Sequence, residues 1–268
     1  MASAHREYGS DEYWITRHGN RKKRKRDDDV TDEWLLSWET LQPLLADCWP
    51  SGASVLDLGC GTSPLALDLV HDTDARVHAI DIAPGAVQHQ QEEQRARRAR
   101  GDKTASRASF DVVDVTRPGS LGNAAYDACI DKSTTDGLLC DTKGGAERVR
   151  SMYVNVGAAL RPDTVVAVCS WRDPDGDEGL EWLVDVVFGG LQAGAATQPS
   201  CPSPYWTLDA HTFVSCSGVR GPHVYVLRRR SLRRSSRIQS GAAEEGDGDA
   251  VEAAELRMRC HLHEEVDE

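Results

Sequence analysis

Short apolar segments alternate with segments of helical periodicity between residues 54 and 191, and this alternation constrains the fold more than any other feature. Segments typical of buried strands occur at residues 54–61, 76–82, 109–115, 126–132 and 164–170. Segments typical of helices lie between or after them, at residues 64–72, 84–100, 145–160 and 179–191. Strands that alternate with helices in this order form a mostly parallel sheet with helices on both faces.

Two more apolar segments follow the last predicted helix. Residues 192–204 are small, polar and Pro-containing, which predicts a loop. Residues 212–216 and 223–227 alternate like strands and are joined by a short Gly-rich connection. This arrangement is typical of an antiparallel hairpin, so the sequence predicts an α/β fold whose sheet has seven strands and closes with a C-terminal hairpin.

The length of 268 residues fits one domain with two charged ends. We expect the domain over residues 31–227, beginning with a helix over 33–48 that is capped by Thr31 or Asp32. Residues 1–30 contain the basic run 21–26 and are expected to be partly disordered. Residues 228–268 are charged and poor in aromatic side chains, which predicts a largely disordered tail with a short helix near 250–260.

The predicted domain is acidic, and this limits its partners. Residues 31–227 hold fifteen Lys and Arg against twenty-seven Asp and Glu. Such a charge repels nucleic acid phosphates and suits a basic protein substrate. No apolar run approaches the ~20 residues that a membrane helix needs, so we expect no membrane partner.

The cysteines and the N-terminal segment indicate the compartment. The eight Cys include no C-x-x-C pair, and Cys60, Cys129, Cys169 and Cys216 lie in apolar segments, which predicts buried free thiols and no metal site. The first thirty residues lack the apolar stretch of a secretory signal. We expect a cytoplasmic protein, with the nucleus as an alternative because the basic run at 21–26 matches a nuclear-localisation pattern.

A glycine-containing turn follows the first predicted strand and precedes a helix. Asp57, Gly59 and Gly61 belong to the segment DLGCGTS. Glycines at this position let a ligand approach the backbone at the carboxyl edge of the sheet. The dinucleotide fingerprint needs a third glycine where this chain has Pro64, and a Walker phosphate loop is absent. A carboxylate at Asp57 favours a hydroxyl-rich ligand that carries an ammonium group.

Two more carboxylates end the next two predicted strands. Asp81 lies twenty residues after Gly61, where an acid can accept hydrogen bonds from both hydroxyls of a ribose. Asp114 ends the third predicted strand and can accept from an adenine amino group. Taken alone, the glycine turn could be only a tight connection, and each Asp could be only a solvated residue at a strand end. Three successive predicted strands that each end in Asp together predict one nucleoside site.

These segments resemble the class I, seven-stranded S-adenosylmethionine-dependent methyltransferases. The segments EYW-x-x-R (12–17), Glu33-Trp34, DLGCGTS, AIDIAPGAV and above all IDKSTTDGLL narrow the resemblance. They are similar to a eukaryotic family that contains the lysine and N-terminal methyltransferases of translation elongation factor 1-alpha and the citrate synthase lysine methyltransferase. The resemblance covers about residues 10–227 and implies a Rossmann-like three-layer sandwich and S-adenosyl-L-methionine as cofactor.

The resemblance also implies roles for particular residues. Gly59 and Gly61 would contact the cofactor backbone, Asp81 with Ile82 would hold its ribose, and Asp114 with Val115 would flank its adenine. Trp14 and Arg17 would close over the methionine end. The implied cofactor-binding set is Trp14, Arg17, Asp57, Gly59, Gly61, Asp81, Ile82, Asp114, Val115 and Asp131. The family usually has Gly where this chain has Ser133.

Asp131 is the predicted catalytic residue. A lysine amine must lose its proton before it attacks a methyl group, and a carboxylate can orient the entering ammonium while desolvation favours the neutral form. The sequence thus predicts methylation of a protein lysine or N-terminal amine, with an elongation factor or other abundant protein as partner. A small-molecule methyltransferase and a cofactor-binding scaffold without turnover stay open as alternatives.

Overall fold

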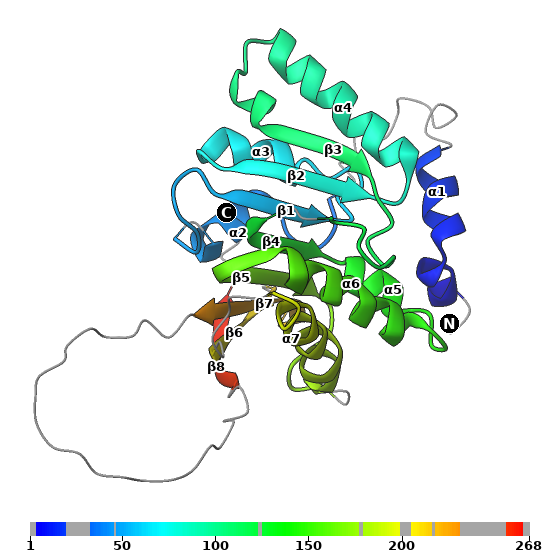
Figure 1. Ribbon diagram of the computed structural model, residues 1–268, viewed down its shortest axis with the longest axis vertical. Helices are drawn as coiled ribbons and strands as arrows, with labels where there is room; N and C mark the ends of the chain where they lie inside the picture. Colours follow the sequence, from blue (N-terminus) through cyan, green and yellow to red (C-terminus); the bar gives the residue numbers. More distant parts are fainter. Residues whose placement is uncertain are drawn as a thin grey trace, which may run out of the picture.

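An eight-stranded sheet forms the centre of the computed structural model, in the order β3-β2-β1-β4-β5-β7-β6-β8 (Figure 1). The structure describes residues 4–19, 33–45, 47–122, 125–176, 179–198, 205–215, 218–230 and 256–264. The strands are β1 (Ser54–Leu58), β2 (Arg76–Asp81), β3 (Ala108–Val112), β4 (Tyr126–Lys132), β5 (Leu160–Ser170), β6 (Tyr205–Val214), β7 (Arg220–Arg230) and β8 (Leu256–Glu264). Strands β1 to β5 are parallel, and β7 is antiparallel to both β5 and β6. The predicted sheet with its C-terminal hairpin is therefore confirmed, and β8 is added to it.

The register of the parallel strands brings the ends of three of them to one edge. Asp57 of β1 pairs with Ala79 of β2 and with Ile130 of β4. Leu58, the last residue of β1, pairs with Asp131. The turns that follow β1, β2 and β4 therefore leave the sheet at the same edge, which is where ligands bind in doubly wound folds.

Helices cover both faces of the sheet and enclose two apolar cores. Helices α2 (Trp38–Leu45), α3 (Leu65–Asp72) and α4 (Pro84–Ala99) pack on one face. Helix α6 (Gly145–Ala159), the π-helix η4 (Trp182–Phe188) and α7 (Gly189–Ala195) pack on the other, and α5 (Thr134–Leu139) adds Leu138 and Leu139 to this core. A short 3-10 turn, η3 (Thr104–Arg107), precedes β3. The predicted three layers are present.

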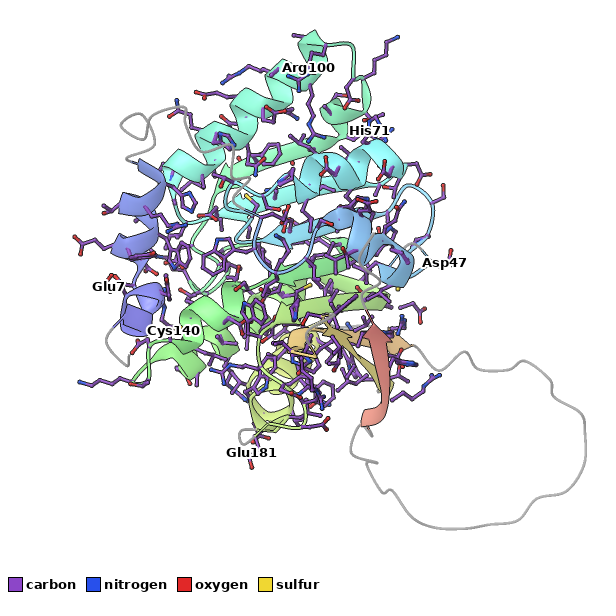
Figure 2. All side chains as sticks on the ribbon, turned by 180° about the vertical axis from the view of Figure 1, so that it is seen from behind. Glu7, Asp47, His71, Arg100, Cys140 and Glu181 are labelled. Carbon is purple, nitrogen blue, oxygen red and sulfur yellow. The ribbon has the colours of Figure 1, made fainter. Side chains whose placement is uncertain are left out.

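Two N-terminal elements lie across the carboxyl edge of the sheet. They are the 3-10 helix η1 (Ala4–Gly9) and helix α1 (Asp11–Gly19). Arg148 of α6 fixes both, because its Nη1 donates to the Gly9 carbonyl at 2.9 Å and its guanidinium pairs with Asp11. Figure 2 shows Glu7 of η1 and Cys140, just past α5, on the same side of the molecule. The sequence predicted residues 1–30 to be partly disordered, and only the resemblance placed Trp14 and Arg17 of this segment at the site.

The first predicted helix is shorter than expected. It spans Trp38–Leu45 rather than 33–48. Leu35 has a φ of 66°, a left-handed conformation that a right-handed helix excludes. Residues 33–36 therefore form a tight turn, in which the Leu36 N–H donates to the Trp34 carbonyl at 3.0 Å, and Glu33 and Trp34 lie outside the helix.

Glycines within the later helices mark close packing rather than a helix end. The helix predicted to stop at residue 191 continues as α7 to Ala195. A Cβ on Gly190 would lie 2.8 Å from the Arg150 carbonyl oxygen of α6, so glycine is required there for the approach of the two helices. The predicted loop 192–204 is shorter for this reason, and β6 begins at Tyr205 rather than at residue 212.

The C-terminal tail contains a strand where the sequence predicted a helix. Residues 256–264 form β8, which runs parallel to β6 with Trp206 opposite Leu256 and Val214 opposite Glu264. The helix expected near 250–260 is therefore wrong for residues 256–260. The domain boundaries remain predictions, and the basic run 21–26, Thr31, Asp32 and Cys216 lie outside the described residues.

Cys60, Cys129 and Cys169 are buried and carry free thiols, as predicted. Within the described part of the chain, none of the helices has the length and apolar character needed to cross a bilayer.

Candidate functional site

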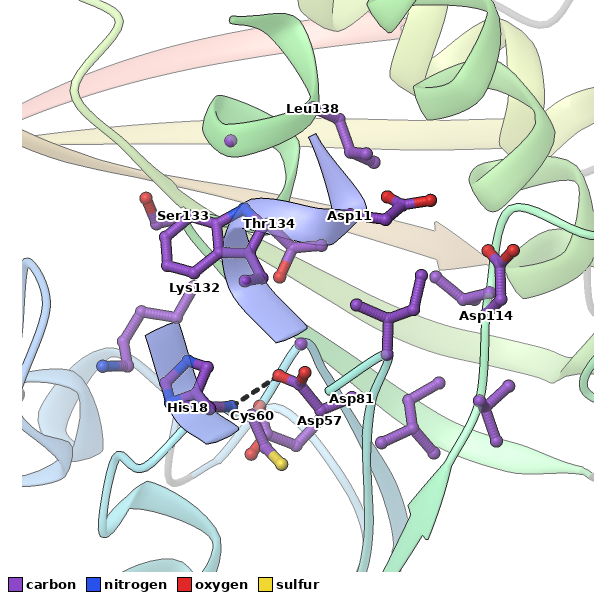
Figure 3. Close-up of a pocket in the computed structure, with 18 of the residues that line it drawn as sticks. Asp11, His18, Asp57, Cys60, Asp81, Asp114, Lys132, Ser133, Thr134 and Leu138 are labelled. Atoms are coloured by element: carbon purple, nitrogen blue, oxygen red, sulfur yellow. Dashed lines mark hydrogen bonds between the residues drawn. The ribbon is translucent and has the colours of Figure 1, made fainter. Parts of the chain in front are cut away.

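A cavity opens at the carboxyl edge of the sheet, under α1 (Figure 3). It encloses about 1070 Å³ when the solvent at its mouth is included. Its wall includes every residue of the predicted cofactor-binding set except Asp131: Trp14, Arg17, Asp57, Gly59, Gly61, Asp81, Ile82, Asp114 and Val115. The sequence therefore identified residues that the fold brings together, although their roles toward a cofactor stay predictions.

The turn after β1 requires both of its glycines. Gly59 and Gly61 have φ values of 61° and 52°. A Cβ on Gly59 would overlap with the Thr134 hydroxyl, which itself donates to the Leu58 carbonyl at 2.8 Å. A Cβ on Gly61 has no closer neighbour than the Gly59 carbonyl, at 4.0 Å, so the space beside Gly61 is left to the cavity. This is the backbone cradle that a ligand needs at this edge.

Asp81 shapes the cavity from the end of β2. One carboxylate oxygen accepts from the Gly61 N–H at 2.8 Å, and the other accepts from the Ala83 N–H at 2.7 Å. Burial raises the pKa of Asp81, while these hydrogen bonds and the nearby His18 lower it. Figure 3 shows Asp81 and His18 pointing toward one another across the cavity. The remaining lone pairs of a carboxylate can each accept a hydroxyl, which suits a ribose diol.

Asp57 is a buried carboxyl group among other charges. Its side chain is almost inaccessible to solvent, and burial raises its pKa to about 7. The ammonium of Lys132 opposes this shift, whereas Asp81, Glu33 and Asp131 reinforce it. A cationic ligand in the cavity would favour the ionised form, so the donor set fits an ammonium-bearing or sulfonium-bearing ligand.

Asp114 lies in a turn past the end of β3 rather than in the strand, which ends at Val112. Its carboxylate accepts from the Thr116 N–H at 3.1 Å, from the Thr116 hydroxyl at 2.6 Å and from Arg117 Nε at 2.9 Å. These contacts fix the turn, so Asp114 and Val115 both reach the cavity wall. Ile82 lines the same cavity, and the adenine contact of Asp114 and Val115 stays a prediction.

Aromatic side chains of the N-terminal segment form the opposite wall. Trp14 Nε1 donates to the Tyr8 carbonyl at 2.7 Å, and the Trp14 ring lies 6.3 Å from the ring of Trp34. The Arg17 guanidinium lies 6.0 Å from the Trp34 ring centroid, and its Nη1 donates to the Tyr13 hydroxyl at 3.3 Å. A guanidinium held in this way can bind a carboxylate that enters beneath it.

Sequence analysis missed a buried ion pair beside the cavity. The Lys132 ammonium, with a side chain 6% exposed, pairs with Glu33 and donates to the Trp34 carbonyl at 2.9 Å. Glu33 also accepts from the Ser63 hydroxyl at 2.9 Å. These contacts hold the entry to α2 against β4 and place Trp34 in the cavity wall. A lysine at the end of a strand that is buried on both faces is the one signal that could have indicated the pair.

The structure places Asp131 outside the cavity wall. This residue is fully buried and is not part of the cavity wall. Its carboxylate accepts from the Thr134 N–H at 2.8 Å, the Thr135 hydroxyl at 2.5 Å and the Tyr153 hydroxyl at 2.7 Å. Burial raises its pKa to about 6 against these hydrogen bonds. Asp131 therefore caps the start of α5 and ties it to α6, and its catalytic role stays a prediction.

Ser133 departs from the glycine that the resemblance predicts, and the structure shows why glycine is favoured there. Ser133 has a φ of 73°, and its N–H donates to the Cys169 carbonyl at 3.0 Å. The left-handed turn is thus kept with a serine, and Ser133 still lines the cavity.

A comparison with known families decides the class. A family model described as a methyltransferase domain matches residues 50–183, which is half of the chain. The chain belongs to this methyltransferase family. Its cofactor is S-adenosyl-L-methionine, and the cradle beside Gly61, the carboxylate of Asp81 and the buried Asp57 fit that molecule.

Solved structures agree with this fold at low sequence identity. The methyltransferase is 20% identical, with a TM-score of 0.53, to a structure described as "Conversion of a Disulfide Bond into a Thioacetal Group during Echinomycin Biosynthesis", over 82% of this chain and 93% of that one. It is 14% identical, with a TM-score of 0.50, to magnesium protoporphyrin IX methyltransferase from Synechocystis PCC 6803 with bound S-adenosylmethionine, over 84% and 97%. The [4+2]-cyclase SpnF is 15% identical, with a TM-score of 0.50, over 85% and 97%. Among curated proteins the sequence finds no match.

Proposed function

We propose that this methyltransferase transfers the methyl group to an amine of a protein, a lysine side chain or an N-terminus. The observation that carries the proposal is the segment Asp131–Asp136, because its residues Lys132, Ser133 and Thr134 form the cavity wall below Trp34. This is the segment on which the resemblance to the lysine and N-terminal methyltransferases depends. The acidic charge of residues 31–227 supports a basic protein as partner.

The residues of the cavity would divide the work of binding and orientation. Asp81 would accept the ribose hydroxyls, and Arg17 would bind the cofactor carboxylate from above. When bound, S-adenosyl-L-methionine would supply a methyl group on a positively charged sulfur, and a neutral amine would take the methyl carbon in line while the sulfur leaves with the electron pair of the C–S bond.

The acceptor amine would enter beside the two tryptophans, whose rings pack against each other edge to face. Trp14 and Trp34 narrow the cavity and exclude water from the amine, and desolvation lowers the pKa of an ammonium. The proton leaves to water before attack. Because Asp131 lies outside the cavity, orientation of the amine falls to the aromatic walls, and in-line alignment by such walls can contribute ~7–11 kcal/mol.

Labelling identifies the acceptor class directly. Purified protein is incubated with a tritiated methyl donor and cell lysate, beside an Asp81→Ala variant that lacks the ribose-binding carboxylate. Label in a protein band that requires Asp81, located on an amine by mass spectrometry, is the expected result. Label that appears only in small products would contradict the proposal.

A small-molecule acceptor is the second candidate. It is favoured by the structural relatives, since magnesium protoporphyrin IX methyltransferase is named for a small molecule. A scaffold without turnover is a third, and it would bind S-adenosylhomocysteine in calorimetry while transferring no label. We also propose that the protein acts in the cytoplasm, with the nucleus as the alternative, which imaging of a tagged chain with and without residues 21–26 tests.

A further inference from the structure

Two large apolar side chains are exposed next to each other at the end of β5 and in the connection between β6 and β7. Trp171 is 55% exposed and Val219 is 61% exposed. The Trp171 ring lies against the backbone of Gly221, because a Cβ on that glycine would be 3.2 Å from the Trp171 ring. We call Trp171 and Val219, with the charged residues Asp173, Asp175 and Arg220 beside them, the Trp171 patch.

The Trp171 patch is held in place on both sides. Arg220 donates to Asp173 at 3.1 Å and to Asp175 at 2.8 Å, so the segment after β5 is tied to the hairpin. The Trp171 N–H donates to the Asp136 carboxylate at 2.9 Å, and Asp136 also accepts from the Ser170 hydroxyl at 2.6 Å. Because these contacts already fix the segment around Trp171, the Trp171 patch loses little conformational entropy when a partner binds to it.

The same contacts join the Trp171 patch to the cofactor cavity. Asp136 belongs to α5, whose Gly137 and Leu138 line that cavity. Ser133, another cavity residue, donates its N–H to Cys169, two residues before Trp171. The segment that lines this side of the cavity therefore lies directly against the end of β5, which Trp171 follows.

We propose that the Trp171 patch docks the polypeptide that carries the acceptor amine, which rests on the proposed function. A polypeptide extends beyond the cavity and crosses the neighbouring surface, whereas a small acceptor ends within the cavity. Its flanking segment would place an apolar side chain on Trp171 and Val219. Arg220 pairs with Asp173 and Asp175, and Arg172 follows Trp171 directly, so the acidic charge of residues 31–227 as a whole is what favours a basic segment.

The test measures KM and kcat separately, with the protein band that the wild type labels used as the purified substrate. Trp171→Ala and Val219→Ser are expected to raise KM for that protein about tenfold and to leave kcat at saturation unchanged. The affinity for S-adenosylhomocysteine should not change in either variant, which also shows that each one folds. Val112→Ser is the matched control, since Val112 is 51% exposed but lies on the outer strand β3.

Each other outcome overturns the docking role and has a distinct cause. If a protein is labelled and neither variant raises KM, the proposed function stands and the docking role is wrong. If label enters only small products, the proposed function itself fails and the docking role falls with it. If sedimentation shows that Trp171→Ala turns a dimer into monomers, the patch serves a second copy of the chain instead.

Discussion

Gly59→Ala is the most direct test of how the cofactor turn is built. The substitution forces an alanine into a φ of 61°, which costs about 1–2 kcal/mol. It also drives a methyl group into Thr134, whose Cβ would be 3.1 Å from the new atom. Overpacking of this kind costs a further ~1–3 kcal/mol. We therefore expect a loss of roughly 3 kcal/mol in the free energy of unfolding.

The measurement is thermal and urea unfolding together with calorimetry of S-adenosylhomocysteine. A loss of this size lowers Tm by roughly 6–12 °C for a domain of this length. Affinity should also fall, because Thr134 and the Gly61 cradle are displaced together.

Gly52→Ala is the matched control for Gly59→Ala. Gly52 has a φ of 71°, but a Cβ there meets nothing within 4 Å, so only the backbone strain of about 1–2 kcal/mol remains. Cofactor affinity should be unchanged in this variant. Equal losses of stability in the two variants would refute the reasoning, because contact with Thr134 would then cost nothing.

The remaining predictions concern the charged groups around the cavity. Asp131→Asn should lower the free energy of unfolding by about 2–3 kcal/mol, measured with urea, and keep kcat within a few-fold of the wild type. A variant that folds but shows no turnover would instead support the catalytic role predicted for Asp131. Asp57 has a folded pKa near 7, above its unfolded value, so its contribution to stability falls as pH rises from about 4 to 7. Between pH 4 and 7, the free energy of unfolding of Asp57→Asn relative to that of the wild type should therefore rise by up to about 4 kcal/mol. If the two proteins show the same dependence of unfolding free energy on pH, the raised pKa of Asp57 is refuted. Lys132→Met should lower the free energy of unfolding by roughly 3 kcal/mol because it leaves the Glu33 carboxylate without its ion-pair partner. The double variant with Glu33→Gln should regain part of this loss, and strictly additive losses would mean that the two residues do not interact.

The nucleoside side of the cavity could be predicted because its signals are local. The strand that ends in Asp57, the glycines of the next turn and the acid at Asp81 follow each other in a fixed order along the chain. In a parallel sheet, strand ends share one edge, so the order in sequence decides the arrangement in space. Asp114 reached the cavity even though β3 ends two residues earlier, because the turn after the strand continues along the same edge.

The acceptor side could not be predicted in the same way. Asp131 is next to last in β4 and Asp81 is last in β2, and a helix starts three residues after each of them. The Asp131 carboxylate accepts from the Thr134 N–H at the start of α5, whereas the Asp81 carboxylate accepts from the Gly61 N–H in the turn after β1. A strand-end Asp is thus directed either to a ligand or to a helix start, and the local pattern is the same in both cases. Lys132 was missed because its partner Glu33 is 99 residues away in the chain.

The tail shows a related limit. β8 follows a low-complexity acidic segment, and composition averaged over residues 228–268 conceals nine residues that pair with β6. Alternation is visible within CHLH, but a strand of this kind is defined by the edge it meets. That edge, β6, was itself predicted seven residues too short at its start.

The cofactor half and the acceptor half of the cavity are held by different contacts. They therefore differ in which residues can be substituted without loss of cofactor binding. The cofactor half rests on backbone geometry at Gly59 and Gly61 and on short-range contacts of Asp81. The acceptor half rests on long-range contacts, in which Lys132 fixes Trp34 and Arg148 fixes the start of α1. Substitutions there can reshape the wall that meets the acceptor while the cradle of the cofactor stays intact. We therefore expect the N-terminal segment and the surface beyond β4 and β5 to determine the choice of methyl acceptor, and substitutions at Trp34 should alter that choice before they alter cofactor affinity.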